Sequence, residues 1–179
     1  MEKILFNKEQ IEKAVENVAI EISQLIRKKN MKSPTLMCVL DGAFRFYADI
    51  VKQIKSPIVC DFIKLSSYSG NKQGRLTIDK YPKHSMHGKD IIIIDDIFDT
   101  GNTLNYAILQ IMTHDPKSIA AVTLLNRRKN LNKIEEDIIY INGLIIDDEW
   151  IAGYGMDDFQ GTSRNLNYIY QINNEENGN

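Results

Sequence analysis

Cysteine, proline and tryptophan are scarce in this chain, and long apolar runs are missing. The 179 residues include two cysteines, four prolines and one tryptophan. Two cysteines give almost no support to a disulfide framework or a thiolate metal centre, so we expect Cys38 and Cys60 to be small core residues of buried strands. No apolar run approaches the ~18 residues that a membrane-spanning helix needs, and the amino-terminal sequence has no apolar signal-peptide segment. These absences favour a cytoplasmic protein without a membrane partner.

An excess of basic residues is also missing. The net charge is -2 and 26% of the residues are charged, so nothing indicates a dedicated nucleic-acid-binding protein. The hydrophobic fraction of 43% is ordinary for a soluble protein, and a chain of this length suits one domain. We expect that domain to cover residues 1–172, followed by a polar, disordered tail over residues 173–179.

The most informative stretch covers residues 91–104. Its four isoleucines, 91–94, suit a strand that is buried on both faces of a parallel sheet. Asp95 and Asp96 follow where this strand is expected to end, and the turn Asp-Thr-Gly-Asn-Thr (99–103) comes next. The apolar pattern after the turn predicts a helix; it comprises Leu104, Ile108, Ile111 and Met112. Open α/β sheets bind ligands at this kind of edge, beyond the carboxyl ends of their strands.

The turn has the chemistry of a phosphate site. Gly101 allows close approach of the backbone, Thr100 and Thr103 supply hydroxyls, and a helix amino terminus presents free N–H groups. Asp95 and Asp96 would repel a phosphate, but they can accept hydrogen bonds from a ribose diol, and Mg²⁺ on a pyrophosphate tolerates nearby acid. A plain acidic turn with a helix cap would explain an isolated Asp-Asp pair. The whole pattern favours a ligand that carries both phosphate and ribose.

The segments before this stretch predict a helix and three further elements. Residues 7–29 form an amphipathic helix with a capping box, Asn7 and Gln10. We then expect a strand over 35–40 and a helix over 44–54, joined by the turn Asp41-Gly42-Ala43. This turn is either a second anion site or a simple tight turn. A strand over 58–65 follows. Residues 66–87 have little apolar periodicity, which is typical of a mobile lid or of a disordered segment.

The segments after it predict two more strands, over 118–125 and 138–146, with Gly143 as a bulge. Trp150 is either a core aromatic or a stacking residue. The expected fold is an α/β domain with a mostly parallel central sheet of about five strands and helices on both faces. A small lobe would combine the amino terminus with residues past Ile138.

Residues 91–104 resemble the 5-phosphoribosyl 1-pyrophosphate (PRPP) signature of the type I phosphoribosyltransferases: an apolar strand, two acids, two apolar residues and Asp-Thr-Gly-x-Thr. The form of this signature with Asp at position 99 resembles the 6-oxopurine branch of the family, the hypoxanthine-guanine phosphoribosyltransferases. The resemblance runs in order from about Leu36 to Ile172. It implies the type I phosphoribosyltransferase fold with a small hood lobe. It also implies Mg²⁺-dependent transfer of 5-phosphoribosyl from PRPP to hypoxanthine or guanine, giving IMP or GMP and pyrophosphate, in a homodimer or homotetramer.

The resemblance also implies a role for particular residues. Asp99 would be catalytic, handling the proton on nitrogen 7 of the purine. The ribose-phosphate site would comprise Asp95, Asp96, Asp99, Thr100, Gly101, Asn102 and Thr103. The pyrophosphate site would comprise Asp41, Gly42, Ser67, Tyr68 and Arg164. The purine site would comprise Arg127, Trp150 and Ile151. The metal ligands would be Asp157, Asp95 and Asp96, although counting back from Arg164 gives Asp158 in place of Asp157.

Two residues depart from the family pattern. Asp41 stands where Lys or Arg is common, so only its backbone carries over to a pyrophosphate role. Arg127 stands where a Lys donates to the 6-oxo group, and its planar fork is not equivalent to an ammonium. The alternatives are a phosphoribosyltransferase for xanthine or a pyrimidine, and a non-catalytic PRPP-sensing regulator. The sequence contains neither Gly-x-x-x-x-Gly-Lys-Ser/Thr nor Gly-x-Gly-x-x-Gly, which sets aside P-loop and Rossmann nucleotide binding.

Overall fold

A computed structural model describes residues 3–68, 75–130 and 138–172. The expected tail over residues 173–179 lies outside them. The central sheet has six strands in the order β4-β3-β2-β5-β6-β7. Four of the five neighbouring pairs are parallel, and β4 is antiparallel to β3 at one edge. The strands are β2 (Thr35–Leu40), β3 (Val59–Tyr68), β4 (Arg75–Lys80), β5 (Asp90–Phe98), β6 (Ser118–Arg127) and β7 (Ile139–Ile146).

The isoleucine run at the start of β5 explains why this strand is central. All four side chains are fully buried. Because side chains alternate along a strand, Ile92 and Ile94 pack into one apolar cluster and Ile91 and Ile93 into another on the opposite face. A strand with no polar face can lie only in the middle of a covered sheet, which confirms the prediction of a mostly parallel sheet with helices on both faces.

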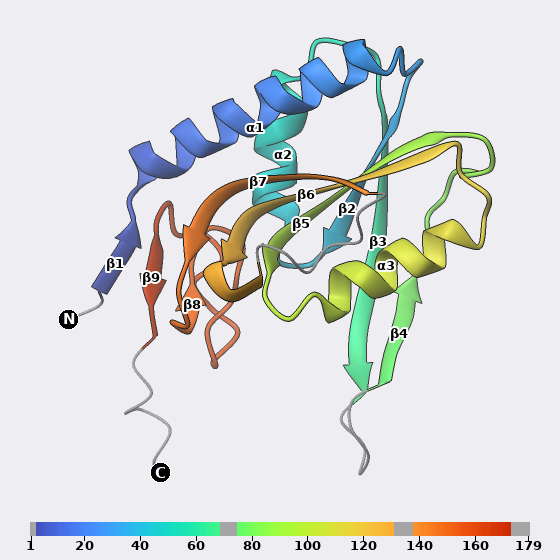
Figure 1. The fold of residues 1–179 in the computed structure, drawn as a ribbon. Helices are drawn as coiled ribbons and strands as arrows, with labels where there is room; N and C mark the ends of the chain where they lie inside the picture. Colours follow the sequence, from blue (N-terminus) through green and yellow to red (C-terminus); the bar gives the residue numbers. More distant parts are fainter. Residues whose placement is uncertain (1–2, 69–74, 131–137, 173–179) are drawn as a thin grey trace.

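Three helices cover the two faces of the sheet: α1 (Lys8–Lys28), α2 (Phe44–Gln53) and α3 (Asn102–Met112). Helices α1 and α2 lie over one face and α3 over the other (Figure 1). The capping box at the start of α1 is confirmed: the Asn7 side chain accepts from the Gln10 backbone N–H at 2.9 Å, and the Gln10 side chain accepts from Asn7 N–H at 3.0 Å. No described helix is both long enough and apolar enough to cross a membrane.

A small second sheet combines the two ends of the chain, as Figure 1 shows. It has the antiparallel order β1-β9-β8, where β1 is Lys3–Phe6, β8 is Ile151–Ala152 and β9 is Ile169–Gln171. The sequence placed everything past Ile138 in this lobe, and that boundary was wrong, because β7 pairs with β6 in the central sheet. The short 3-10 helix Arg128–Asn130 follows β6.

Part of the segment expected to be an irregular lid is regular structure. Strand β3 continues through residue 68, and β4 returns antiparallel beside it. The base of this hairpin is fixed by Asp61, whose carboxylate accepts from the backbone N–H groups of Lys83 at 3.0 Å and His84 at 2.8 Å. Burial raises the pKa of Asp61, but these hydrogen bonds outweigh burial and lower it below its usual value. Residues 69–74 lie outside the described chain, so closure of a lid stays a prediction.

Two smaller expectations were wrong. Cys38 is buried as predicted, but Cys60 is exposed. Gly143 does not form a bulge, because the β6–β7 register is the same before and after it: Thr123 pairs with Asn142, and Leu125 with Leu144. A Cβ atom at this position would lie 2.9 Å from the Leu124 carbonyl oxygen. The glycine therefore allows close approach of the neighbouring backbone.

This contact predicts the effect of Gly143→Ala. The added methyl group would press on a backbone oxygen that cannot turn away, while the lower flexibility of the unfolded chain offsets part of the cost. We expect the free energy of unfolding to fall by about 1–2 kcal/mol. Urea denaturation measures it. Ile139→Val, at a partly exposed site in the same strand, is the control and should change it by less than about 0.5 kcal/mol. A Gly143→Ala chain as stable as the wild type would contradict this account.

Candidate active site

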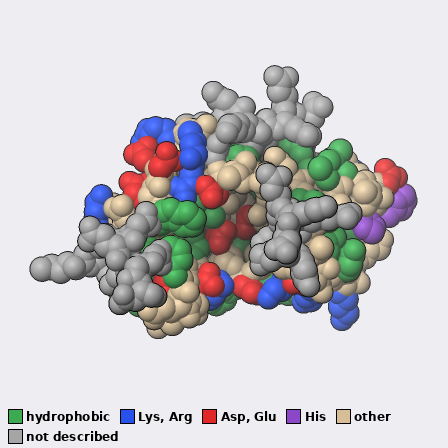
Figure 2. All heavy atoms as spheres, turned by 90° about the horizontal axis from the view of Figure 1, so that it is seen from below, with side chains coloured by type: hydrophobic (Ala, Val, Ile, Leu, Met, Phe, Trp, Pro, Cys, Tyr) green, Lys and Arg blue, Asp and Glu red, His purple; other side chains and the backbone are tan. Residues whose placement is uncertain are grey.

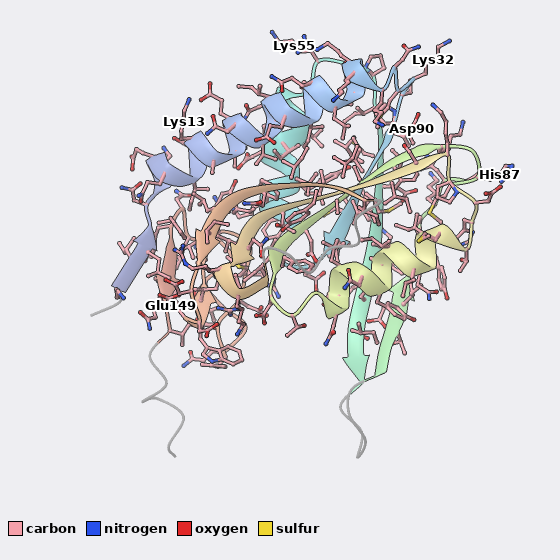
Figure 3. The ribbon with its side chains drawn as sticks, in the orientation of Figure 1. Lys13, Lys32, Lys55, His87, Asp90 and Glu149 are labelled. Atoms are coloured by element: carbon pink, nitrogen blue, oxygen red, sulfur yellow. The ribbon has the colours of Figure 1, made fainter. Side chains whose placement is uncertain are left out.

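The candidate site lies at the carboxyl ends of β2, β5 and β6. Parallel strands deliver their carboxyl ends to one edge of the sheet, so the segments that follow them meet there. Figure 2 looks at this edge from below and shows acidic side chains recessed near the middle of the face, with basic side chains nearby. Figure 3 shows Glu149 at this end of the molecule, and Asp90 at the opposite end of the sheet.

Asp95 and Asp96 lie within β5, because the strand continues to Phe98 and does not end at the acids as expected. The Asp95 side chain is 4% exposed and accepts from the Asp96 backbone N–H at 2.9 Å. Asp96 accepts from the Ile97 N–H at 2.7 Å. Burial raises the pKa of Asp95 well above its usual range, and the neighbouring Asp96 raises it further; burial also raises the pKa of Asp96. A ligand that brings hydroxyl donors would satisfy such recessed carboxyls.

The turn from β5 into α3 has an open helix terminus. Gly101 adopts φ +85°, in the left-handed region that favours glycine, and a Cβ there would lie 2.7 Å from the Phe98 ring. No side chain of the described chain caps the amino end of α3. The Asn102 N–H contacts the Thr100 hydroxyl at 3.3 Å, and the Asn105 N–H donates to the Gly101 carbonyl. This geometry suits an anion at the start of α3.

The turn after β2 packs directly on the acid pair. It begins with a cis peptide between Leu40 and Asp41. A Cβ at Gly42 would lie 1.7 Å from Asp96 Oδ2, so only glycine fits there. The Asp41 carboxylate accepts from the Lys64 ammonium at 2.6 Å and therefore turns toward β3. The second strand–turn–helix unit is thus part of the same site as the first.

Arg127 connects the catalytic candidate to the segment after β7. It is the last residue of β6 and is buried. Its Nε donates to the Asp99 carboxylate, and its Nη1 donates to the backbone carbonyls of Asp147 at 2.7 Å and Glu149 at 3.0 Å. The sequence placed Arg127 just past the strand, at the ligand edge, and the structure places it at that edge. Its ion pair with Asp99 could not have been predicted from their separation in the chain.

The segment after β8 carries a second ion pair. Arg164 pairs with Asp157 at 2.6 Å, and Arg164 Nη1 donates to the Gly155 carbonyl at 2.6 Å. Asp158 instead holds its own loop: its carboxylate accepts from the N–H and hydroxyl of Thr162 and from the hydroxyl of Ser163. These hydrogen bonds, the Thr162 hydroxyl foremost, lower the pKa of Asp158 far below its usual range. Of the two acids, Asp157 therefore stays the metal-ligand prediction.

The predicted base-binding residues lie where β8 begins. Trp150 is 57% exposed, and its ring centroid is 6.1 Å from that of Phe159, with 45° between the ring planes. It is not a core aromatic. Ile151 is partly buried at the start of β8. Ser67 and Tyr68 are the last residues of β3. The roles assigned to these four residues stay predictions.

Sequence reasoning missed Arg45, in the first turn of α2. Its guanidinium lies 4.9 Å from the centre of the Tyr154 ring and donates to the Leu166 carbonyl and, at 2.6 Å, to Asn167 Oδ1. The Tyr154 hydroxyl donates to Asp49 of α2 at 2.7 Å. Helix α2 thereby fixes the segment that carries Asp157 and Arg164. Lys64 was missed as well, and neither residue belongs to a recognisable motif.

The fold and this edge define an α/β protein with a site suited to a sugar phosphate. Comparison with known proteins agrees: residues 3–158 match the phosphoribosyl transferase domain. The hypoxanthine-guanine-xanthine phosphoribosyltransferase of Tritrichomonas foetus is 34% identical over 171 residues, 94% of this chain and 90% of that protein. The hypoxanthine-guanine phosphoribosyltransferase of Bacillus subtilis (strain 168) is 34% identical over 172 residues, 94% and 92% of the two chains.

Solved structures give the same result. The hypoxanthine phosphoribosyltransferase from Trypanosoma cruzi, in complex with the product IMP, superposes with a TM-score of 0.85 at 31% identity, covering 97% of this chain and 95% of that one. A hypoxanthine phosphoribosyltransferase from Staphylococcus aureus gives 0.83 at 29% identity, covering 99% and 94%. The chain belongs to the phosphoribosyltransferase family. The expected fold and the resemblance are both confirmed.

Magnesium is the ion that this family implies, and the donors present fit it. Among the residues that the structure describes, no three His, Cys, Asp or Glu side chains gather as a metal centre. Mg²⁺ at phosphate-handling sites is usually held by one or two carboxylates together with waters and substrate phosphates. Asp95 and Asp96 supply two recessed carboxyls, and Asp157 supplies another. This donor set suits an ion that binds together with its substrate.

The contacts of Arg127 predict a loss of stability in Arg127→Lys. A lysine ammonium cannot reach Asp99 and both carbonyls with the geometry of a guanidinium fork. We expect the free energy of unfolding to fall by about 1–3 kcal/mol, since the three hydrogen bonds of a buried guanidinium are lost or weakened. Urea denaturation measures it. The matched control is Arg128→Lys at the next position, whose exposed pair with Asp147 at 2.7 Å should contribute less than about 1 kcal/mol. Equal losses in both variants would refute the prediction.

Proposed function

We propose that this chain transfers the 5-phosphoribosyl group of PRPP to hypoxanthine or guanine, forming IMP or GMP and releasing pyrophosphate. The observation that carries the proposal is one edge of the sheet where the acid pair Asp95-Asp96, the open turn at Gly101 and the turn at Gly42 meet. PRPP has the matching parts: a ribose diol, a 5-phosphate and a pyrophosphate. The names of the related enzymes support the same reaction.

The remote parts of PRPP would position its reacting carbon. The turn from Thr100 to Thr103 binds the 5-phosphate with its hydroxyls and the N–H groups that begin α3, and Asp95 and Asp96 accept from the ribose hydroxyls. Binding energy at both ends of the ribose fixes the anomeric carbon between base and pyrophosphate. Mg²⁺, held by Asp95, Asp96 or Asp157 with substrate oxygens, would supply charge neutralisation for the departing pyrophosphate.

The remaining residues divide between the leaving group and the base. The backbone of Asp41 and Gly42 binds pyrophosphate, together with Arg164, Ser67 and Tyr68. Residues 66–87 exclude water from the ribosyl cation.

The purine base is bound by three residues. Arg127 donates to its 6-oxo group, Trp150 stacks on its ring, and the Ile151 backbone contacts its 2-position. Asp99 takes the proton from nitrogen 7 as the bond to the anomeric carbon forms. We further propose that the chain acts in the cytoplasm as a homodimer or homotetramer.

The test of the reaction is pyrophosphate release from PRPP and Mg²⁺ with hypoxanthine, guanine, xanthine, adenine and uracil in parallel. We expect turnover with hypoxanthine or guanine. Turnover with xanthine alone would make Arg127 the selector of a different base, and turnover with uracil alone would overturn the purine assignment. Silence with all five bases, combined with PRPP binding in calorimetry, would identify a PRPP sensor.

The proton-transfer role predicts the behaviour of Asp99→Asn. An amide keeps the size of the carboxylate but cannot accept the proton, so kcat should fall by about 100-fold or more while the affinity for PRPP changes little. Steady-state kinetics and PRPP calorimetry measure the two quantities. Asp115→Asn, at an exposed position in the loop after α3, is the control and should change neither. Small and equal losses in kcat and affinity would count against the role of Asp99.

A further inference from the structure

Asp41 places a negative charge beside the turn that is proposed to bind pyrophosphate. The carboxylate is half exposed, so burial does not remove its charge. An uncompensated acid at this point would repel the most highly charged part of PRPP. Mg²⁺ on the pyrophosphate would offset part of this repulsion, and a protein cation beside Asp41 would offset it directly.

The compensating group is Lys64, at the carboxyl end of β3. Its ammonium lies 2.6 Å from Asp41 Oδ2. The pairing has a structural cause, since the β2–β3 register places Lys64 opposite Leu40, the last residue of β2. Phe62, two residues earlier, packs on Tyr47 of α2. Because side chains alternate along a strand, Lys64 projects to the same side as Phe62, where the turn into α2 begins.

Lys64 has donors to spare at this position. An ammonium has three N–H donors, and Asp41 is its one hydrogen-bond partner in the described chain. The lysine side chain is 40% exposed, so its other donors face solvent. Lys64 can therefore keep its bond to Asp41 and donate to a phosphate oxygen at the mouth of the turn.

Apart from Lys64, few cations lie close to the turn at Gly42 that is proposed to bind pyrophosphate. Gly42 packs on Asp96, and the Gly42 carbonyl packs on Gly155, next to the segment that carries Asp157. The one other cation proposed for pyrophosphate is Arg164, which already pairs with Asp157 at 2.6 Å. Two more cations lie near this turn: Arg45 donates to Leu166 and Asn167, and the Lys80 ammonium lies 4.9 Å from the centre of the Phe62 ring. Of these cations, Lys64 is the one that contacts Asp41.

We propose that Lys64 is a pyrophosphate-binding residue that also neutralises the charge of Asp41. This inference rests on the proposed function, because it concerns the leaving group of the same reaction.

Calorimetry with PRPP and with pyrophosphate, each with Mg²⁺, tests it on the full chain. Lys64→Met removes the ammonium and keeps the apolar stem, and should weaken both ligands by about tenfold or more, the loss typical of one charge-assisted hydrogen bond. Asp41→Asn removes the negative charge beside the pyrophosphate and leaves the Lys64 ammonium free to donate, so it should tighten the binding of both ligands. The double variant should recover only part of the affinity lost in Lys64→Met, because the repulsion from Asp41 is removed but the donor is still missing.

The double variant separates donation from simple neutralisation. If Lys64 only cancelled the charge of Asp41, removing both would restore wild-type affinity, and that result would overturn the proposal. Unchanged affinity in Lys64→Met would overturn it too. Lys64→Arg keeps a cationic donor and should retain most of the affinity. The matched control is Lys13→Met, which breaks an exposed pair with Glu16 at 2.7 Å on α1, away from the site (Figure 3), and should change nothing.

The same measurements keep this inference distinct from the proposed function. A wild-type chain that binds neither PRPP nor pyrophosphate would overturn both. A wild-type chain that binds PRPP and turns over a purine, with Lys64→Met equal to it, would overturn the role of Lys64 alone. Circular dichroism of each variant shows whether a loss of binding comes from unfolding. If Lys64→Met unfolds, the affinity of Lys64→Arg tests the role of a cationic donor at this position.

Discussion

Close packing at two glycines brings the site together. Gly42 lies so near the Asp96 carboxylate that any Cβ would overlap it, and a Cβ at Gly155 would lie 2.3 Å from the Gly42 carbonyl oxygen. The turn after β2 is thus held between the acid pair of β5 and the segment after β8. Because backbone contacts of this kind leave no room for a side chain, they fix the spacing of the three segments more strictly than any ion pair at the surface does. The relative positions of the residues proposed to bind the substrate depend on that spacing.

Acids and bases at this edge occur as pairs. Asp99 pairs with Arg127, Asp157 with Arg164 and Asp41 with Lys64. Each pair keeps a cation beside a carboxylate at this edge, and of the six side chains only Arg127 is buried. A ligand that brings phosphate oxygens and Mg²⁺ can satisfy both partners of such a pair, the phosphate contacting the base and the ion contacting the acid. This explains how an acid-rich edge can suit a highly negative substrate.

The sequence predicted the elements better than their junctions. The isoleucine run, the capping box of α1 and the turn at Gly101 were predictable because each follows from local pattern and helix-end chemistry. The hairpin of β3 and β4 was missed, since its residues show little alternation and its pairing depends on the tertiary structure. Gly143 was assigned to a bulge because a glycine in a strand has two explanations, and only the position of the Leu124 carbonyl separates them. The pairs of Arg127 with Asp99 and of Lys64 with Asp41 join residues 28 and 23 positions apart, so no local pattern could indicate them.

In its proposed base-binding role, Arg127 would also bear on which base the site accepts. Its Nε and Nη1 are used by Asp99 and by the carbonyls of Asp147 and Glu149, whereas Nη2 has no hydrogen-bond partner among the described residues. A guanidinium only donates, so a base placed against Nη2 must present an acceptor. The 6-oxo group of hypoxanthine or guanine does so, whereas the 6-amino group of adenine would set donor against donor. Three hydrogen bonds orient the guanidinium. In the proposed role, a donor oriented in this way would discriminate between bases more sharply than a flexible lysine.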